Sequence, residues 1–326
     1  MPQPVSIRAG QAVEGDLTEQ STKASSVTIA LTAITLIAFA SNSVLCRLAL
    51  AHGTIDPTCF TSLRILSGAA TLWIISALLR RRSRPRGSWI SASMLALYAF
   101  AFSYAYVSLN TGTGALILMG AVQATMIVAG IRAGERPIPI QWIGLLLALG
   151  GTVYLVSPGI TGPPVLGSTL MAVAGFAWGV YSLRGRASGD PITATTDNFI
   201  RAVPIALGIS LVQLGEMRWS TQGVLLALLS GSLTSGIGYV VWYAALRGLT
   251  ATRAAVVQLA VPVIAAIGGV VFLSEAIIAR LVIASLAVLG GVGLAVAGGG
   301  RRKRGESTRV GGAKCMGGKV IARRGP

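Results

Sequence analysis

Ten long apolar stretches dominate this chain and limit what it can fold into more than any other feature. A helix needs roughly 20 apolar residues to cross the ~30 Å hydrocarbon core of a bilayer. The gaps between the stretches are short, so consecutive helices must be antiparallel neighbours and no room remains for a soluble domain. The sequence therefore predicts an all-α membrane protein with ten transmembrane helices, at about 27–50, 57–80, 88–109, 112–131, 138–157, 164–186, 195–217, 221–246, 250–273 and 276–298.

The composition supports a membrane protein and argues against other classes. Of the 326 residues, 53% are hydrophobic and only 11% are charged, whereas a soluble domain carries about 25% charged residues. The net charge of +17 does not indicate nucleic-acid binding, because the basic residues cluster in short runs between apolar stretches, as in Arg80–Arg86. The first apolar stretch is too long for a cleavable signal peptide. The three cysteines do not have metal-ligand spacing.

The arginines near the helix ends predict the orientation, because the side richer in basic residues is cytoplasmic. One side holds three, Arg47, Arg218 and Arg280. The other side holds eleven: Arg80, Arg81, Arg82, Arg84, Arg86, Arg132, Arg136, Arg184, Arg186, Arg247 and Arg253. We therefore expect a multi-pass protein of the bacterial cytoplasmic (inner) membrane with both termini inside. Residues 1–26 are expected to form a disordered cytoplasmic N-terminal tail and residues 299–326 a basic cytoplasmic tail.

The chain contains an internal repeat. An offset of 137 residues places Arg47 on Arg184 and Arg64 on Arg201, and after the second helix an offset of 140 places Glu135 on Glu275. These matches carry weight because charges are rare here. They indicate two five-helix repeats, 27–157 and 164–298. Five is odd, so the second repeat enters the membrane from the opposite side. Inverted repeats of this kind are typical of secondary transporters that bind their substrate near the midplane between the halves.

Two segments carry a resemblance to a known family. The ten-helix layout, the five-plus-five duplication, GFAWGVYSLRGR (175–186) and LAVPVIAAIGGVVFLSE (259–275) resemble the EamA-type drug/metabolite transporters over residues 27–298. More narrowly, the chain is similar to the YddG-type aromatic amino-acid exporters. It departs from the family pattern at Val122, which stands where the second half has Pro262, so any helix break there is expected on one side only.

The polar and aromatic residues at the helix centres are the candidates for lining a substrate path. Duplicated or near-duplicated positions and shared helix faces select them, although packing, a membrane-interface belt or interhelical hydrogen bonds explain such residues too. Two glycines, Gly175 and Gly179, flank Trp178 and are expected to leave room beside its ring for a ligand. The predicted substrate-binding residues are Asn42, Tyr98, Met119, Gln123, Trp178, Tyr239 and Gln258.

This lining would be mostly apolar, with neutral hydrogen-bonding groups and no fixed charge, which suits a zwitterion with an apolar or aromatic side chain. The sequence therefore predicts a secondary transporter that exports amino acids by alternating access. An exporter of drugs or other small metabolites, or a passive channel, remains an alternative. No clustered catalytic groups, phosphate-binding loop or metal ligands are found, so neither an enzyme nor a cofactor is expected. Proton antiport and facilitated diffusion both remain open.

Four charged residues are predicted to form two symmetry-related ion pairs, Arg64 with Glu275 and Arg201 with Glu135, shared with Arg47 and Arg184. An arginine within a membrane helix is costly unless it finds a partner or reaches the interface. Asp197 competes for Arg201, since it lies four residues earlier. Direct contact of Arg64 with substrate is the second interpretation. The fifth and tenth helices carry many glycines and few polar residues, so they are expected to support the bundle or to form a homodimer contact.

Overall fold

The computed structural model describes residues 6–79, 87–134, 138–157, 162–185, 190–249, 254 and 257–294, with side chains from residue 26 onward. The described residues are helical apart from their connections and one isolated bridge between Ile55 and Trp219. The helices are α1 (Ser6–Ala51), α2 (Pro57–Leu78), α3 (Trp89–Tyr106), α4 (Thr111–Arg132), α5 (Pro139–Val156), α6 (Val165–Gly185), α7 (Pro191–Val212), η1 (Leu214–Glu216), α8 (Thr221–Leu229), η2 (Ser230–Ile237), α9 (Gly238–Leu246), α11 (Ala260–Leu273) and a final helix, Ala279–Leu294.

The elements α8, η2 and α9 form one continuous helical rod, Thr221–Leu246. Six described helices are long and apolar enough to cross a membrane: Ser26–Ala51 of α1, then α2, α4, α5, α6 and Thr221–Leu246. Ala260–Leu273 and Ala279–Leu294 are shorter apolar helices. With α3 and α7, the described helical segments therefore account for every apolar stretch of the sequence.

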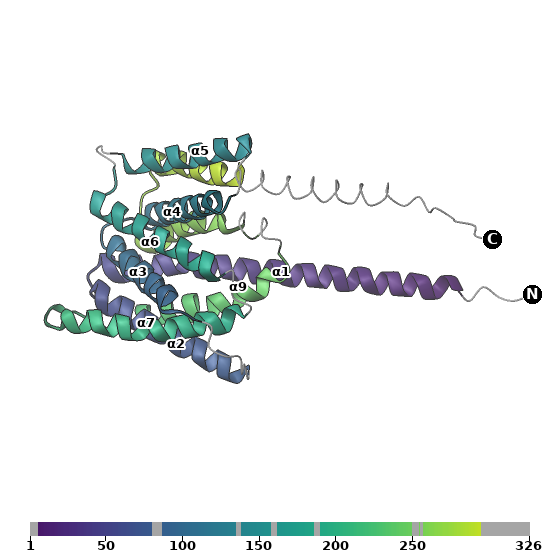
Figure 1. Cartoon of the computed structure of the whole chain (residues 1–326), viewed down its shortest axis with the longest axis horizontal. Coiled ribbons are helices and arrows are strands. Elements are labelled where there is room, and N and C mark those ends of the chain that lie inside the picture. The colour runs from purple at the N-terminus through teal and green to yellow at the C-terminus, as the bar shows by residue number, and fades with distance from the viewer. Residues whose placement is uncertain are drawn as a thin grey trace, which may run out of the picture.

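The N-terminal segment differs from the expectation of a disordered tail. Helix α1 begins at Ser6 and runs without interruption to Ala51, so residues 6–26 continue the membrane helix (Figure 1). These residues contain no proline, and Ala, Gln, Glu and Lys among them are good helix formers. Extending a formed helix is also easier than nucleating a new one. The predicted basic tail at 299–326 lies outside the described residues.

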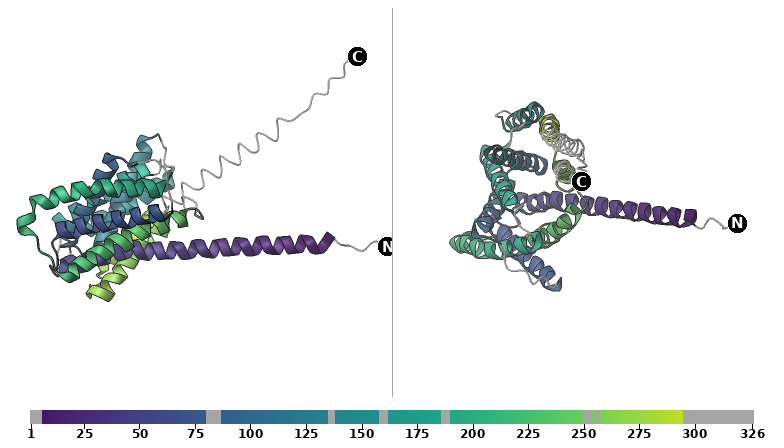
Figure 2. Two further views of the ribbon diagram at one scale, coloured as in Figure 1. Left: turned by 90° about the horizontal axis from the view of Figure 1, so that it is seen from below. Right: turned by 45° about the vertical axis from the view of Figure 1, so that its right-hand side comes forward.

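Equivalent helices of the two repeats pack against each other. Helix α2 lies along α7, the second helix of each half, and α4 packs on α11, the fourth of each half. At the opposite edge of the bundle from α2 and α7, α5 lies beside Ala279–Leu294 (Figures 1 and 2). Glycines allow this last contact: a Cβ at Gly151 would lie 2.7 Å from the Cβ of Ala287, and one at Gly291 would meet the carbonyl of Gly144. The fifth and tenth helices thus support the bundle as predicted.

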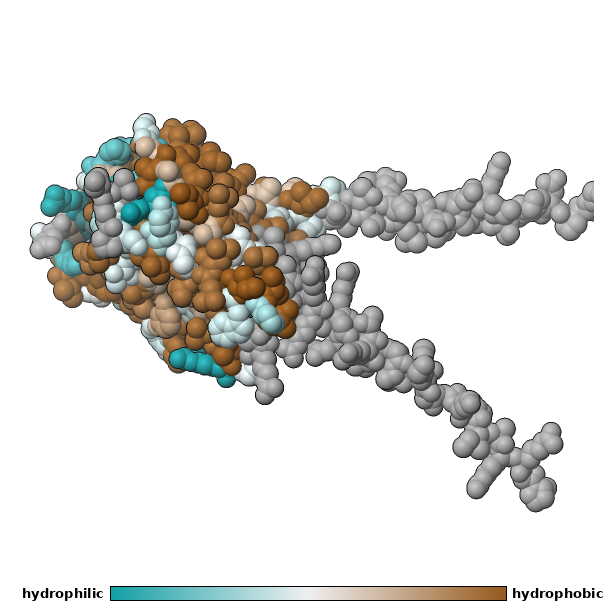
Figure 3. Space-filling view, turned by 90° about the horizontal axis from the view of Figure 1, so that it is seen from above, coloured by the Kyte–Doolittle hydropathy of each residue, from teal (hydrophilic) through white to brown (hydrophobic). Residues whose placement is uncertain are grey.

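The outer surface of the bundle is strongly apolar. Large apolar side chains face outward on many helices, including Trp73 at 60% exposure on α2 and Phe272 at 68% on α11. Figure 3 shows hydrophobic residues covering most of the visible face of the bundle, with most of the hydrophilic residues gathered at its left end in this view. So large an exposed apolar area is not found on soluble monomers. The molecule is a multi-pass membrane protein.

Helix caps fix where α2 begins and tie the two halves together. The Asp56 carboxylate accepts hydrogen bonds from the backbone N–H groups of Thr58 and Cys59, each at 2.9 Å, and Pro57 occupies the first helical position. Asp56 also makes two hydrogen bonds to the backbone of Arg218 in the second half. Its N–H donates to the Arg218 carbonyl at 2.9 Å, and its carboxylate accepts from the Arg218 N–H at 3.1 Å. The start of α2 is therefore anchored to the segment that leads into α8.

Candidate functional site

Arg64 is buried in the interior of the bundle, with 4% of its surface exposed. It lies about 10 Å along α2 from the start of that helix, given a rise of 1.5 Å per residue. Its Nη2 donates to the Tyr98 hydroxyl at 3.2 Å, and its Nε donates to the Ser235 hydroxyl at 3.4 Å. Its Nη1 is buried and has no hydrogen-bond partner among the described residues. The predicted lining was expected to hold no fixed charge, but the structure places this guanidinium against one of its members.

Asn42 connects the same site to the second half. Its Oδ1 accepts hydrogen bonds from Ser230 at 2.8 Å and from Thr234 at 3.2 Å, and its Nδ2 donates to the Tyr98 hydroxyl at 3.5 Å. All four side chains are buried. Helices α1, α3 and η2 therefore meet through one hydrogen-bonded network, as buried polar groups require.

The segment η2 is a π-helix in the middle of Thr221–Leu246. Its sequence, SGSLTSGI, is rich in small residues, so η2 and α2 can approach backbone to backbone. A Cβ at Gly231 would meet the carbonyl oxygen of Arg64 and the hydroxyl of Ser67. Short π-helical segments within α-helices are frequent at functional sites. The hydroxyl residues Ser230, Thr234 and Ser235 were missed from the sequence, although three polar residues among glycines in an apolar helix are a recognisable signal.

Aromatic rings extend the site toward α6 and α9. The ring centroids of Tyr98 and Trp178 are 4.9 Å apart, and Trp178 stacks on Tyr239 at 5.6 Å and on Tyr181 at 5.3 Å. The Arg64 guanidinium carbon lies 5.3 Å from the Tyr98 ring centroid and 5.2 Å from that of Phe102, within cation–π range. We call Asn42, Arg64, Tyr98, Trp178 and Tyr239 the central cluster. Four of its members were predicted as substrate-binding residues, and the structure brings them together.

The glycines beside Trp178 do not have the role expected of them. A Cβ at Gly175 would lie 2.5 Å from the Cβ of Ala121, and one at Gly179 would lie 2.8 Å from the Cβ of Thr125. Both glycines therefore allow α6 to pack closely on α4, whose atoms fill the space that the missing side chains leave.

The other three predicted lining residues, Met119, Gln123 and Gln258, are not part of the hydrogen-bonded central cluster. On α4, Gln123 Nε2 donates to the sulfur of Met119 at 3.8 Å, and Gln123 lines an apolar cavity of about 110 Å³ between α4, α5, α6 and Ala279–Leu294. Gln258 is half-buried just before α11. In the described part of the chain, no hydrogen bond joins these three residues to the central cluster.

Glu275 pairs with Arg47, which was expected to share this carboxylate, and not with Arg64. Its Oε1 lies 3.4 Å from Arg47 Nε, and its two oxygens accept the Thr111 backbone N–H at 2.8 and 3.1 Å. Arg47 Nη1 also donates to the carbonyls of Tyr106 and Val107, each at 2.9 Å. This corrects the Arg64–Glu275 pair. The carboxylate caps the first turn of α4, where backbone N–H groups lack helical partners, and Asn110 makes no side-chain cap bond there.

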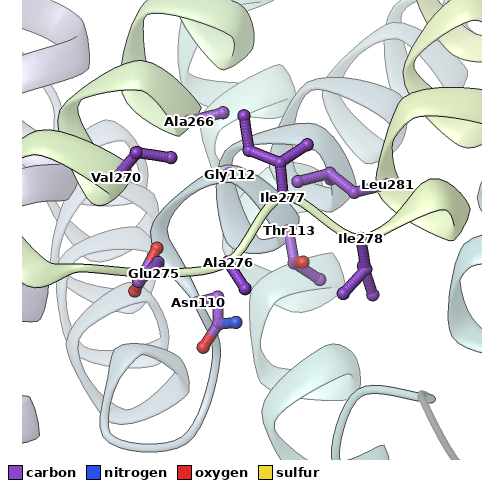
Figure 4. A pocket seen from close by; sticks show the side chains of 10 residues that line it. All are labelled: Asn110, Gly112, Thr113, Ala266, Val270, Glu275, Ala276, Ile277, Ile278 and Leu281. Carbon is purple, nitrogen blue, oxygen red and sulfur yellow. The ribbon is translucent and has the colours of Figure 1, made fainter.

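Local backbone geometry places the Glu275 carboxylate at the start of α4. Helix α11 ends at Leu273. The next residue, Ser274, adopts a left-handed conformation with φ of 54°, and the chain then passes beside Asn110 at a small pocket of about 10 Å³ (Figure 4). Gly269 leaves room for the carboxylate, because a Cβ there would meet Glu275 Oε2. The residue 140 positions before Ser274 is Gly134, which also has a positive φ, of 89°, and precedes Glu135.

The second predicted pair involves Arg201. Its Nε lies 3.2 Å from Asp197 Oδ2 one turn earlier, the competing partner that helical spacing indicated. Asp197 Oδ2 also accepts the Gly87 N–H at 2.8 Å, which ties α7 to the start of α3. Glu135 lies outside the described residues, so its pairing with Arg201 stays a prediction.

Comparison with known proteins identifies the family. Residues 26–157 and 165–297 each match the EamA-like transporter family. The chain belongs to that family. The two matches coincide with the two predicted repeats and together cover most of the described chain. As a member of this family, the molecule is a transporter and not an enzyme.

Individual proteins similar to this chain include two that are uncharacterized and one that is named for its substrates. The chain is 50% identical over 271 residues to an uncharacterized protein of Pseudomonas aeruginosa, covering 83% of this chain and 94% of that protein. It is 29% identical to an uncharacterized transporter of Archaeoglobus fulgidus, covering 75% and 89%. It is 28% identical over 148 residues to the threonine/homoserine exporter RhtA of Escherichia coli, covering 44% and 49%. A solved crystal structure superposes with a TM-score of 0.55 at 24% identity, covering 81% of this chain and 96% of that one, which shows a shared fold.

Proposed function

We propose that this protein is a secondary transporter that exports amino acids, with a preference for aromatic or other apolar side chains, by alternating access. The observation that carries the proposal is the central cluster, in which hydrogen-bonding groups and stacked rings from both repeats converge in the interior of an EamA-type bundle. A site between the repeats is where transporters built from inverted halves bind substrate.

The chemistry of the cluster favours a small amphiphilic substrate. The flat faces of Trp178 and Tyr239 suit an apolar or aromatic side chain. The amide of Asn42 and the hydroxyl of Tyr98 suit polar main-chain groups. Met119, Gln123 and Gln258 are proposed as a wall supplied by the fourth helix of each half. The amino-acid class is supported from outside by the similarity to RhtA, which is named as a threonine/homoserine exporter.

The proposed topology has ten membrane crossings. The six apolar spans, α3, α7 and the two shorter apolar helices would supply them. The excess of arginine at one set of helix ends supports cytoplasmic termini and the bacterial inner membrane as the location. A homodimer contact through α5 and Ala279–Leu294 remains a prediction.

Uptake by proteoliposomes tests this function. Purified protein is reconstituted, and labelled phenylalanine, tryptophan, methionine and threonine are offered with and without a pH gradient. We expect uptake of at least one aromatic or apolar amino acid above that of empty liposomes. Failure of all four would reject amino-acid transport and favour the exporter of other metabolites or drugs. A rate that changes with the pH gradient indicates proton coupling, and an unchanged rate indicates facilitated diffusion.

Counterflow separates a carrier from a passive channel. Liposomes loaded with unlabelled substrate should take up labelled substrate faster than empty ones, because a loaded carrier returns its site more readily. A channel shows no such stimulation. The alternating-access part of the proposal therefore depends on this measurement alone.

A further inference from the structure

The guanidinium of Arg64 is bound on two of its nitrogens and free on the third. Nη2 and Nε are hydrogen-bonded to Tyr98 and Ser235, while Nη1 is buried without a described partner. We propose that Arg64 is the carboxylate anchor of the transported molecule, and that a carboxylate is the obligatory group of the substrate. This inference rests on the proposed transport function and names the chemical feature that the site selects.

The charge of Arg64 is not neutralised by a carboxylate within hydrogen-bond distance in the described part of the chain. The two described ion pairs use other arginines, Arg47 and Arg201. A buried charge without a counter-ion is strongly unfavourable. An anionic ligand would supply the missing counter-ion each time it binds.

The internal repeat allows Arg64 to be compared with an arginine at the matching position of the other half. The duplicate of Arg64 is Arg201, and Arg201 carries its own counter-ion, Asp197, one turn earlier. Subtracting the same 137 residues from 197 gives position 60, which is Phe60, fully buried. The first half therefore has the arginine without its carboxylate. One half keeps a neutralised arginine and the other keeps a cation open to an incoming anion.

The neighbours of Arg64 hold it in a fixed position for such a ligand. The rings of Tyr98 and Phe102 lie against the guanidinium, and the hydroxyls of Tyr98 and Ser235 fix its rotation. A guanidinium has five N–H donors in a rigid fork that matches a carboxylate, and hydrogen bonds between charged partners are stronger than neutral ones. A positioned fork loses little entropy when the carboxylate arrives.

The cluster offers a cation for the carboxylate but no acidic side chain for an ammonium group. Asn42 Oδ1 is already occupied by Ser230 and Thr234. An α-ammonium group can be accommodated by the ring faces of Trp178 and Tyr239, which attract cations only weakly. The expected substrates are therefore carboxylates with an apolar or aromatic side chain, amino acids included, whereas amines without a carboxylate are excluded. Because Nη1 is sealed in this conformation, the ligand reaches it when the helices around it separate, as alternating access requires.

Three probes that share one phenylalkyl group test the anchor. Phenylalanine carries both charged groups, 3-phenylpropionate only the carboxylate and phenethylamine only the amine. Each competes at neutral pH against labelled phenylalanine on the purified protein in detergent. With the wild type we expect the first two to compete and the amine not to compete. Arg64→Gln should weaken both carboxylates by about 10- to 100-fold, the range for a hydrogen bond to a charged group.

Arg201→Gln is the matched control, because it removes the duplicate arginine, which lies outside the central cluster and already has Asp197 as its counter-ion, and it should leave both affinities within about twofold, a free-energy change of about 0.4 kcal/mol or less. If Arg64→Gln does not yield folded protein, Arg64→Lys replaces it; a point charge without the fork should bind carboxylates about 3- to 10-fold more weakly. Wild-type affinity in the Arg64 variant, or competition by phenethylamine equal to that of 3-phenylpropionate, overturns the anchor while leaving amino-acid transport standing. A wild type that binds neither carboxylate overturns both proposals.

Discussion

At the residue scale, Trp178 joins the other two aromatic members of the central cluster, because its ring touches both Tyr98 and Tyr239 as well as Tyr181. Trp178→Ala should lower the transport rate about tenfold, because it removes the flat apolar wall against which a substrate side chain packs. Trp178→Phe should retain most activity, since a ring remains. Trp73→Ala is the control: Trp73 is 60% exposed on the outer face of α2 and should not affect the rate. Equal rates for Trp178→Ala and wild type would remove Trp178 from the site.

Gly231 also acts as a single residue, because the absence of a methyl group there allows η2 to approach α2 closely. Gly231→Ala should destabilise the protein by about 1–3 kcal/mol, the usual cost of overpacking, since the new Cβ meets the Arg64 carbonyl and the Ser67 hydroxyl. Thermal unfolding in detergent measures this. Gly208→Ala on α7 is the matched control, because a Cβ there meets nothing within 4 Å and the change should be neutral or slightly stabilising. Equal unfolding temperatures for the two variants would contradict the close contact.

At the scale of elements, the Arg47–Glu275 pair joins α1, the end of α3, the start of α4 and the end of α11. We expect a double-mutant cycle of Arg47→Ala with Glu275→Ala to show a coupling of about 0.5–3 kcal/mol, the range for residues in direct contact. The cycle of Arg64→Ala with Glu275→Ala should be additive within about 0.5 kcal/mol, because Arg64 has other partners. Apparent unfolding free energies in one detergent give both values. Coupling in the second cycle and none in the first would restore the pair expected from the sequence.

Sequence could predict the helices and the repeat because apolar length and rare charges are properties of the chain itself. It could not decide between Arg64 and Arg47 as the partner of Glu275, because position along a helix fixes the depth of a side chain but not which helices touch. For the same reason, the sequence could not show that Asn42 bonds to Tyr98 whereas Gln123 bonds to Met119. The π-helix η2 escaped prediction for another reason: its form depends on packing against α2, and only its run of small polar residues marks it in the sequence.

At the scale of the whole molecule, the orientation can be tested by labelling. In a variant lacking the natural cysteines, His52→Cys at the end of α1 should react with a membrane-impermeant maleimide on intact spheroplasts, since His52 is exposed on the side poor in arginine. Ala133→Cys, exposed at the end of α4, should react only after permeabilisation. The reverse pattern would place both termini outside.

The packing of each second, fourth and fifth helix on its own duplicate has a consequence for how such a protein arises. Because each of these helices packs on its own equivalent, a single five-helix polypeptide would already carry both sides of the interface between the halves. Two copies of a unit with an odd number of crossings can meet in this way only if they insert in opposite directions, which describes an ancestral antiparallel dimer of dual topology. In such a dimer every substitution would appear twice. Fusion into one chain would let the two copies diverge, as Phe60 and Asp197 do at matching positions of the two halves.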